Sequence, residues 1–407
     1  MKVKWKNTAN LRPGVILEKL GGIQIVGSDG SISYQGFEYH EIRCVLLGLL
    51  SFPPRCDSLD HERILAIALR NISRVGRLDE NAAIEEINRI ANQELSTREN
   101  QYFVLTSISL RVPTPIRSIS VEKSKIRILP SDYPKKYSSR TDFLKNIRRT
   151  DATPTEYAKV IVSVNDRSFR GAEKKAQNSL GLLRASMCFN ANTGIELFGG
   201  SQWSPINKVR LGEVHTVHRK SGKVCEDMYW FEPFFEEAQA YKASNPDRFS
   251  NNTKWVLSSL NKLKYRSVVK EALLRFVRAL DQRDQNIALV RLWSALEILT
   301  LPSGQNYDLL TRRCSFLFSE AAYHQQVLEH IREYRNSNVH SGEENDKVKS
   351  YCFLLQTYFR ELILFHLRQS SPFTSLDEAN SFLDLPPKKS KLNEKKKMIE
   401  RAIRFRA

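Results

Sequence analysis

The stretch NDKVKSYCFLLQTYFRELILFHLR, residues 345–368, decides the fold of the C-terminal part of this chain. Its apolar side chains recur every three or four residues, which places them on one face of an α-helix. They are Val348, Cys352, Leu355, Phe359, Leu362 and Phe365. Because Lys349, Arg360 and Glu361 interrupt the apolar run, the segment is too polar to cross a bilayer. It predicts a buried helix, and no membrane partner is expected.

The segments before it share the same 3.6-residue period. Trp293 and Leu296 give one of them a broad apolar face, and Pro302 ends that helix. A stripe of this kind is core rather than a cofactor groove. Together they predict an all-α bundle over residues 250–372. The five predicted helices are 254–264, 266–281, 285–300, 307–320 and 325–335.

The first 245 residues have a different pattern. Residues 1–50 show short apolar runs between glycines, typical of strands joined by turns, whereas 58–96 and 170–186 have helical spacing. Residues 101–111 and 157–164 are rich in strand formers. A chain of 407 residues exceeds the usual size of one core. We therefore predict an α+β protein: a mixed α/β N-terminal region (1–245) that senses or regulates, the bundle, and a basic tail (373–407).

The charge balance indicates a polyanionic partner. The formal net charge is +18, which favours nucleic acid. Residues 123–149 and 386–407 each contain nine Lys or Arg against two acidic residues. Tyr133, Tyr137 and Phe143 interleave with the cations of the first segment, as in loops that stack on bases. The alternative, slightly favoured, is a surface loop anchored by aromatics. The tail either forms a short helix that binds nucleic acid or a partner, or is disordered.

The cysteines and histidines predict neither metal nor cofactor. None of the six cysteines forms a Cys-x-x-Cys pair, so no disulfide framework or zinc site is expected. Reduced thiols and an N-terminus without an apolar signal core suggest a cytoplasmic protein. His215 and His218 lack further ligands at suitable spacing and are interpreted as two histidines on one strand.

The most informative motif is YRNSNVHSG, residues 334–342. Arg335 is a fixed cation that grips phosphate, and His340 exchanges protons near neutral pH. Five residues on one continuous helix would place them about 140° apart, which is poor geometry for a shared site. Asn336, Ser337 and Asn338 are weak helix formers. With a capping box at residues 341–344, they predict a junction between helices that turns both side chains toward one cleft.

On these residues the sequence resembles a known family. Arg335, Asn336 and His340 match the Arg-x4–6-His motif of HEPN-domain ribonucleases, including the polar residue after the arginine. The run from Leu289 to Glu297, with Arg312, Arg313 and the His-Ser-Gly at 340–342, resembles the ApeA-like subgroup. The resemblance covers roughly residues 250–370.

The resemblance implies a helical bundle that forms a homodimer and pairs two motifs in a composite cleft. It implies metal-independent cleavage of RNA, such as tRNA or other single-stranded or structured RNA, through attack of the 2′-OH. His340 would transfer protons and Arg335 would stabilise the phosphate. Asn336 would orient the imidazole or hydrogen-bond the phosphate. Glu297 could hold Arg335, although a helix-surface ion pair is the preferred interpretation.

Members of this family act in anti-phage defence or as toxins, which implies a phage trigger or an inhibitory partner. The alternative is a HEPN-like module that binds nucleic acid or protein without cutting. A different enzyme ranks last because no Gly-rich phosphate loop or carboxylate pair is present.

Overall fold

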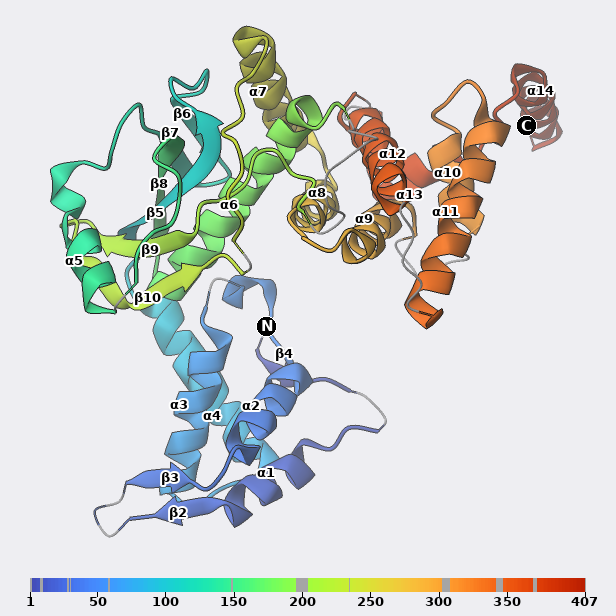
Figure 1. Cartoon of the computed structure of the whole chain (residues 1–407). Helices are drawn as coiled ribbons and strands as arrows, with labels where there is room; N and C mark the ends of the chain where they lie inside the picture. Colours follow the sequence, from blue (N-terminus) through green and yellow to red (C-terminus); the bar gives the residue numbers. More distant parts are fainter. Residues whose placement is uncertain are drawn as a thin grey trace.

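Figure 1 shows the computed structural model, which places both helices and strands along the chain. It describes residues 2–406 apart from 8–9, 28, 30, 58, 148, 195–203, 234, 302–307, 342–346 and 369–371; of residues 226–227 and 338–341 it describes the backbone alone. The protein is α+β: an N-terminal α/β region precedes a series of C-terminal helices, as predicted.

The first hundred residues pack around a hydrophobic core of their own. The prediction of strands and turns for residues 1–50 was wrong in part, because two helices, of 10 and 12 residues, lie within it. The glycines of the first helix are tolerated because Leu17 and Leu20 are fully buried and tertiary packing outweighs propensity. The elements are β1 (Lys4–Trp5), α1 (Pro13–Gly22), β2 (Gln24–Val26), β3 (Ile32–Tyr34), α2 (Glu38–Leu49), β4 (Leu50–Ser51), η1 (Pro54–Cys56), α3 (His61–Arg74) and α4 (Glu80–Ser96).

A six-stranded antiparallel sheet follows, in the order β10-β9-β5-β8-β7-β6. The predicted strands at 101–111 and 157–164 are confirmed as its central pair, β5 and β8. The strands are β5 (Asn100–Arg111), β6 (Ser118–Val121), β7 (Ser124–Ile128), β8 (Tyr157–Asp166), β9 (Val214–Arg219) and β10 (Val224–Phe231).

Alternation along β5 gives the sheet two buried faces. Val104 and Ile108 belong to the large core that contains α6 (Phe169–Ala191), the predicted helix at 170–186. Phe103 and Leu105 point to the other face and pack with Tyr137 of η2 (Lys135–Tyr137), the turn that precedes α5 (Ser139–Asn146). Helix α6 lies between the sheet and the C-terminal helices (Figure 1).

All six helices predicted for the C-terminal part are present. They share one continuous core with the sheet and α6, in which Trp293 is fully buried. Phe276 and Phe359 stack there with ring centroids 4.3 Å apart. The helices are α7 (Pro246–Lys262), α8 (Arg266–Leu280), α9 (Gln285–Thr300), α10 (Asp308–Ser315), α11 (Ala321–Ser341) and α12 (Val348–Arg368).

Two further helices occupy residues 376–406. Helix α13 (Leu376–Leu383) buries Leu376, Ala379 and Leu383 in the same core. Helix α14 (Lys389–Arg406) lies beyond the bundle at the C-terminal end in Figure 1, and none of its residues is buried. The tail is therefore helical, one of the alternatives that its sequence left open.

Candidate functional site

Helix α11 holds Arg335 against helix α9. Its Nη2 lies 3.6 Å from Oε1 of Glu297, and its guanidinium carbon lies 6.0 Å from the centre of the Trp293 ring. The indole is fully buried, while 21% of the Arg335 side chain is exposed. A planar guanidinium that rests on an aromatic ring and faces a carboxylate has a restricted orientation. Arg335 is thus a partly exposed cation with a defined direction.

Glu297 is the residue that orients this cation. Burial raises the pKa of Glu297 above its ordinary value, and the charge of Arg335 offsets part of that rise. The pair is only about a fifth exposed on either side, so it is not the helix-surface ion pair that the sequence favoured. The less favoured sequence hypothesis, in which Glu297 holds Arg335, agrees with this geometry.

The predicted junction after Arg335 is wrong. Helix α11 continues through residues 336–338 to Ser341. Weak helix formers do not end a helix that tertiary contacts support: Ile331 is fully buried, and the Tyr334 hydroxyl donates to Oδ1 of Asn286 at 2.9 Å.

The continuous helix separates positions 335 and 340. They lie about 140° apart around the helix axis and about 7.5 Å apart along it. One chain therefore does not present the two positions on one side of α11. The side chain of His340, and the predicted capping box from residue 342 on, lie outside the described residues.

Asn336 is brought to Arg335. Its side-chain oxygen accepts a hydrogen bond from Nη1 of Arg335 at 3.4 Å, and the residue is exposed. An exposed amide beside a guanidinium can bind the same phosphate. Of the three predicted site residues, the structure places Arg335 and Asn336 together.

Arg312 and Arg313, which also belong to the resemblance, have structural partners. Both guanidinium groups bind the carboxylate of Asp384, at 2.9 Å and 2.7 Å. Arg313 also donates to the carbonyl oxygen of Thr300 and is only 6% exposed. These arginines fasten α10 to the end of α9 and to the residue that follows α13.

The two histidines of β9 point to opposite faces of the sheet. Nδ1 of His218 donates to the carbonyl of Gly222 at 2.8 Å, and its Nε2 lies 2.9 Å from the hydroxyl of Thr216. His215 stacks on Trp230 and lies 2.9 Å from a carboxylate oxygen of Glu232. The prediction of one strand that carries both histidines is confirmed, and both are buried. Within the described ranges, no three His, Cys, Asp or Glu side chains gather as a metal site would require.

The aromatics of the basic segment 123–149 are anchors. Tyr137 and Phe143 are 2% and 7% exposed, and the Tyr133 hydroxyl donates to the carbonyl of Thr106 at 2.5 Å. They cannot stack on bases without unfolding this face of the sheet. The favoured interpretation, anchoring aromatics, is confirmed, although the segment contains β7 and α5 rather than a plain loop.

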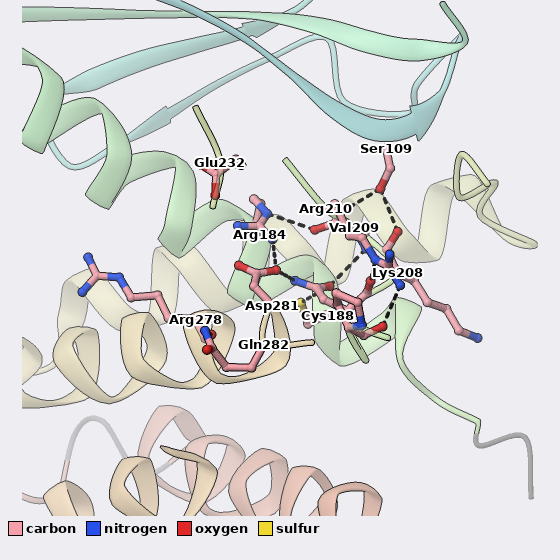
Figure 2. Close-up of polar contacts among 12 residues, drawn as sticks. Ser109, Arg184, Cys188, Lys208, Val209, Arg210, Glu232, Arg278, Asp281 and Gln282 are labelled. Carbon is pink, nitrogen blue, oxygen red and sulfur yellow. Dashed lines mark hydrogen bonds and ion pairs between the residues drawn. The ribbon is translucent and has the colours of Figure 1, made fainter. Parts of the chain in front are cut away.

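Sequence reasoning missed a buried polar network in the middle of the molecule (Figure 2). Arg184 on α6 is 3% exposed and places Nη2 2.5 Å from Oδ1 of Asp281, at the end of α8. Asn207 donates to the same oxygen at 3.0 Å and accepts from the Cys188 thiol. No spacing in the sequence links these positions. The one available signal is an arginine within the apolar run of α6.

Comparisons with protein-family models, with curated proteins and with solved structures found no match to this chain. Within the described residues, no helix combines the length and the apolar character that a membrane span needs.

Proposed function

We propose that this protein is a metal-independent RNA endonuclease of the HEPN type, with Arg335, Asn336 and His340 as its site residues and tRNA as a candidate substrate. The geometry of Arg335 is the observation that carries the proposal. A guanidinium fixed between Trp293 and Glu297, with an exposed amide at Asn336, suits the stabilisation of a phosphate whose negative charge increases in the transition state.

The reaction uses the nucleophile of the RNA itself. A base removes the proton of the 2′-OH as the O2′–P bond forms, and an acid gives a proton to the 5′-oxygen as the P–O5′ bond breaks. The products are a 2′,3′-cyclic phosphate and a 5′-OH. An imidazole near neutral pH can serve in either proton transfer. His340 takes one of these roles, and Arg335 stabilises the phosphorane-like transition state.

The continuous α11 supports a composite site. Because positions 335 and 340 of one helix face different sides, we propose that Arg335 of one copy meets His340 of a second copy in a homodimer. Each of the two composite clefts then holds one Arg335 and one His340, which acts as base or acid while water takes part in the other proton transfer. This refines the sequence hypothesis, which placed both residues of one chain in one junction.

We also propose that the protein is cytoplasmic and acts in anti-phage defence or as a toxin. Its N-terminal region or an inhibitory partner would restrain the nuclease until a phage trigger activates it. All six cysteines are free thiols, five of them buried, which is common in reducing compartments. The separate core of the first hundred residues provides a unit through which such a signal can act.

The test is cleavage of bulk tRNA in EDTA by the purified full chain and three variants. Wild type is expected to cut, whereas Arg335→Ala and His340→Ala are expected to bind RNA without cutting. Arg332→Ala is the matched control, because Arg332 lies on the same helix but pairs with Asp308 and Glu329. In parallel, expression of wild type but not of His340→Ala should arrest growth. Absence of both cleavage and toxicity would contradict the proposal.

A non-catalytic binding module is the second candidate. The uninterrupted α11 favours it, because one chain alone does not assemble Arg335 and His340. Equal RNA binding by all four proteins, with no cleavage and no toxicity, would select this alternative. Cleavage that EDTA abolishes would contradict both.

A further inference from the structure

A basic hollow of about 700 Å³ opens where the segments 204–210 and 238–242 meet helix α12. Five of its lining residues are cationic, and none of those in the described part of the chain is acidic. The cations are Arg111, Lys208, Arg210, Lys242 and Lys349. They come from four separate parts of the sequence. Cations that outnumber acidic groups in the described lining favour an anionic ligand, and the volume lies in the range of small-molecule sites.

Three lining residues of this hollow, Asn207, Lys208 and Arg210, are held by the polar network of Figure 2. Arg184 donates from Nε to the carbonyl of Val209 at 2.9 Å while Asp281 holds its Nη2. Asn207, bound to the same carboxylate, accepts from the backbone N–H of Val209 at 3.0 Å. Both backbone polar groups of Val209 are thus hydrogen-bonded within the network, and Val209 is fully buried.

Ser109 of β5 fixes the residues on either side of Val209. Its hydroxyl donates to the carbonyl of Lys208 at 2.8 Å and accepts from the N–H of Arg210 at 2.7 Å. The backbone of Lys208 and Arg210 therefore has a fixed conformation, and both side chains line the hollow. A site held by a surrounding network in this way is preorganised for its ligand.

Two buried amides at the hollow have no protein partner for their oxygen atoms. Gln285 and Gln356 are 3% and 7% exposed, and Oε1 of each is without a hydrogen bond. Gln285 donates from Nε2 to the carbonyl of Ser204 at 3.3 Å, which leaves its oxygen as an acceptor. Buried polar atoms are nearly always paired, so such atoms at a hollow indicate a ligand that donates hydrogen bonds.

Asn192 supplies the complementary group. Its Oδ1 accepts from the N–H of Lys208 at 3.1 Å, and its buried Nδ2 has no partner. The hollow thus offers an acceptor at Gln285, a donor at Asn192 and an amide at Gln356 that can serve either way. Side-chain amides in this combination recognise the edge of a nucleobase.

We propose that this hollow binds a nucleotide unit, with its phosphate against Lys208 and Lys242 and its base against the amides of Asn192, Gln285 and Gln356. Phe353, on the same face of α12 as Lys349 and Gln356, lines the hollow and offers a ring for stacking. Binding here needs neither Arg335 nor His340, so this site goes beyond the proposed cleavage.

A nucleotide unit has two sources, a free nucleotide or a strand of RNA. A second hollow of about 860 Å³ shares Tyr241 with the first and is lined by Arg248, Arg368 and the 39% exposed Trp255. It is also lined by Arg360, which pairs with Glu361. Cations and an exposed aromatic in a continuing hollow suit the next units of a strand.

The experiment measures binding by the full chain with three variants and one control. The probes are the four nucleoside monophosphates and triphosphates, inorganic phosphate, a poly-glutamate peptide and a labelled single-stranded RNA in EDTA. Lys208→Glu/Lys242→Glu reverses two exposed cations of the hollow, whereas Lys125→Glu reverses an exposed cation on β7. Gln285→Met and Gln356→Met remove the amides at similar volume, and thermal unfolding checks that both fold.

Nucleotides should bind more tightly than phosphate, and Lys208→Glu/Lys242→Glu should weaken them by about tenfold or more, the loss of a charged hydrogen bond. Lys125→Glu should change little. The glutamine variants should weaken nucleotides but not phosphate.

If RNA is the source, its affinity falls in the same variants and nucleotides compete with it; if a free nucleotide is the source, RNA affinity is unchanged. Nucleotides that bind no better than phosphate, effects equal to those of Lys125→Glu, or tighter binding of poly-glutamate would each overturn the proposal. These outcomes do not depend on cleavage.

Discussion

The Glu297 carboxylate lies 3.6 Å from the guanidinium of Arg335, across the contact between helices α9 and α11. Trp293, one helical turn before Glu297, lies beneath the same guanidinium. The two residues of α9 therefore set the direction of a cation on α11. In the proposed enzyme this relationship makes Glu297 a positioning residue rather than a catalytic one.

Removal of the Glu297 carboxylate should lower cleavage without abolishing folding. In Glu297→Gln we expect kcat to fall by about tenfold to a hundredfold, because a catalytic group displaced by about 1 Å costs that much. KM should change less, and Glu297→Asp should restore part of the rate. Glu333→Gln, an exposed residue of α11 with a side chain 71% exposed, is the control. Equal losses in both variants would contradict a positioning role.

The Arg184–Asp281 pair should be the most sensitive polar contact in the molecule. Arg184→Ala leaves Asp281 and Asn207 beside an empty buried position, and breaking such a pair costs about 3–5 kcal/mol of unfolding free energy. Arg275→Ala, which breaks an exposed pair with Glu271, should cost under about 1 kcal/mol. Urea unfolding followed by circular dichroism measures both. Similar midpoints for the two variants would contradict the assignment.

Acid should lower the stability of the folded protein over a pH range that is set by its buried histidines. Burial lowers the pKa of His218 to about 4 and that of His366 to about 3, from an ordinary value of 6.5. The folded state favours the neutral rings, so their contribution is complete above about pH 6.5 and is lost as the pH falls toward 4. The melting temperature should decline across this interval. In His218→Asn the decline should be shallower, and an unchanged slope would contradict this account.

Helix α14 should be dispensable for folding. None of its residues is buried, and Met398, Ile399, Ile403 and Phe405 are all more than half exposed. A chain shortened after Leu385 should therefore melt within about 2 °C of wild type, as surface changes usually do. If α14 contacts RNA, the salt dependence of RNA affinity should also become less steep, because fewer phosphates are neutralised. A large fall in melting temperature would show that α14 packs on the bundle.

The C-terminal helices could be predicted because their apolar residues recur with the helical period and the same residues form the buried faces. The stripe from Val348 to Leu362 is buried in α12, and Phe365 at its end is partly buried against the same core. The N-terminal helix α1 could not, because its glycines indicate a turn, whereas the burial of Leu17 and Leu20 stabilises it as a helix. Local propensity also misplaced the end of α11. The Tyr334–Asn286 hydrogen bond that ties α11 to α9 joins residues 48 positions apart, beyond the reach of a local pattern.

For the site, the sequence could supply Arg335 and its amide neighbour but not their surroundings. Trp293 appeared only as a core residue, although it also supports the guanidinium. The basic hollow was beyond prediction, because Lys208, Gln285 and Lys349 meet only after the sheet and the bundle pack together. In the basic segment 123–149, which did stand out, Tyr137 and Phe143 are buried and belong to the fold.

The most direct test of the central claim is the cleavage of tRNA in EDTA by a mixture of two inactive variants. Arg335→Ala and His340→Ala should each be inactive alone, and mixed dimers should regain part of the wild-type rate, because one of the two composite clefts then pairs an intact Arg335 with an intact His340. The products should end in a 2′,3′-cyclic phosphate. No cleavage by wild type, or full cleavage by either variant alone, would contradict the account.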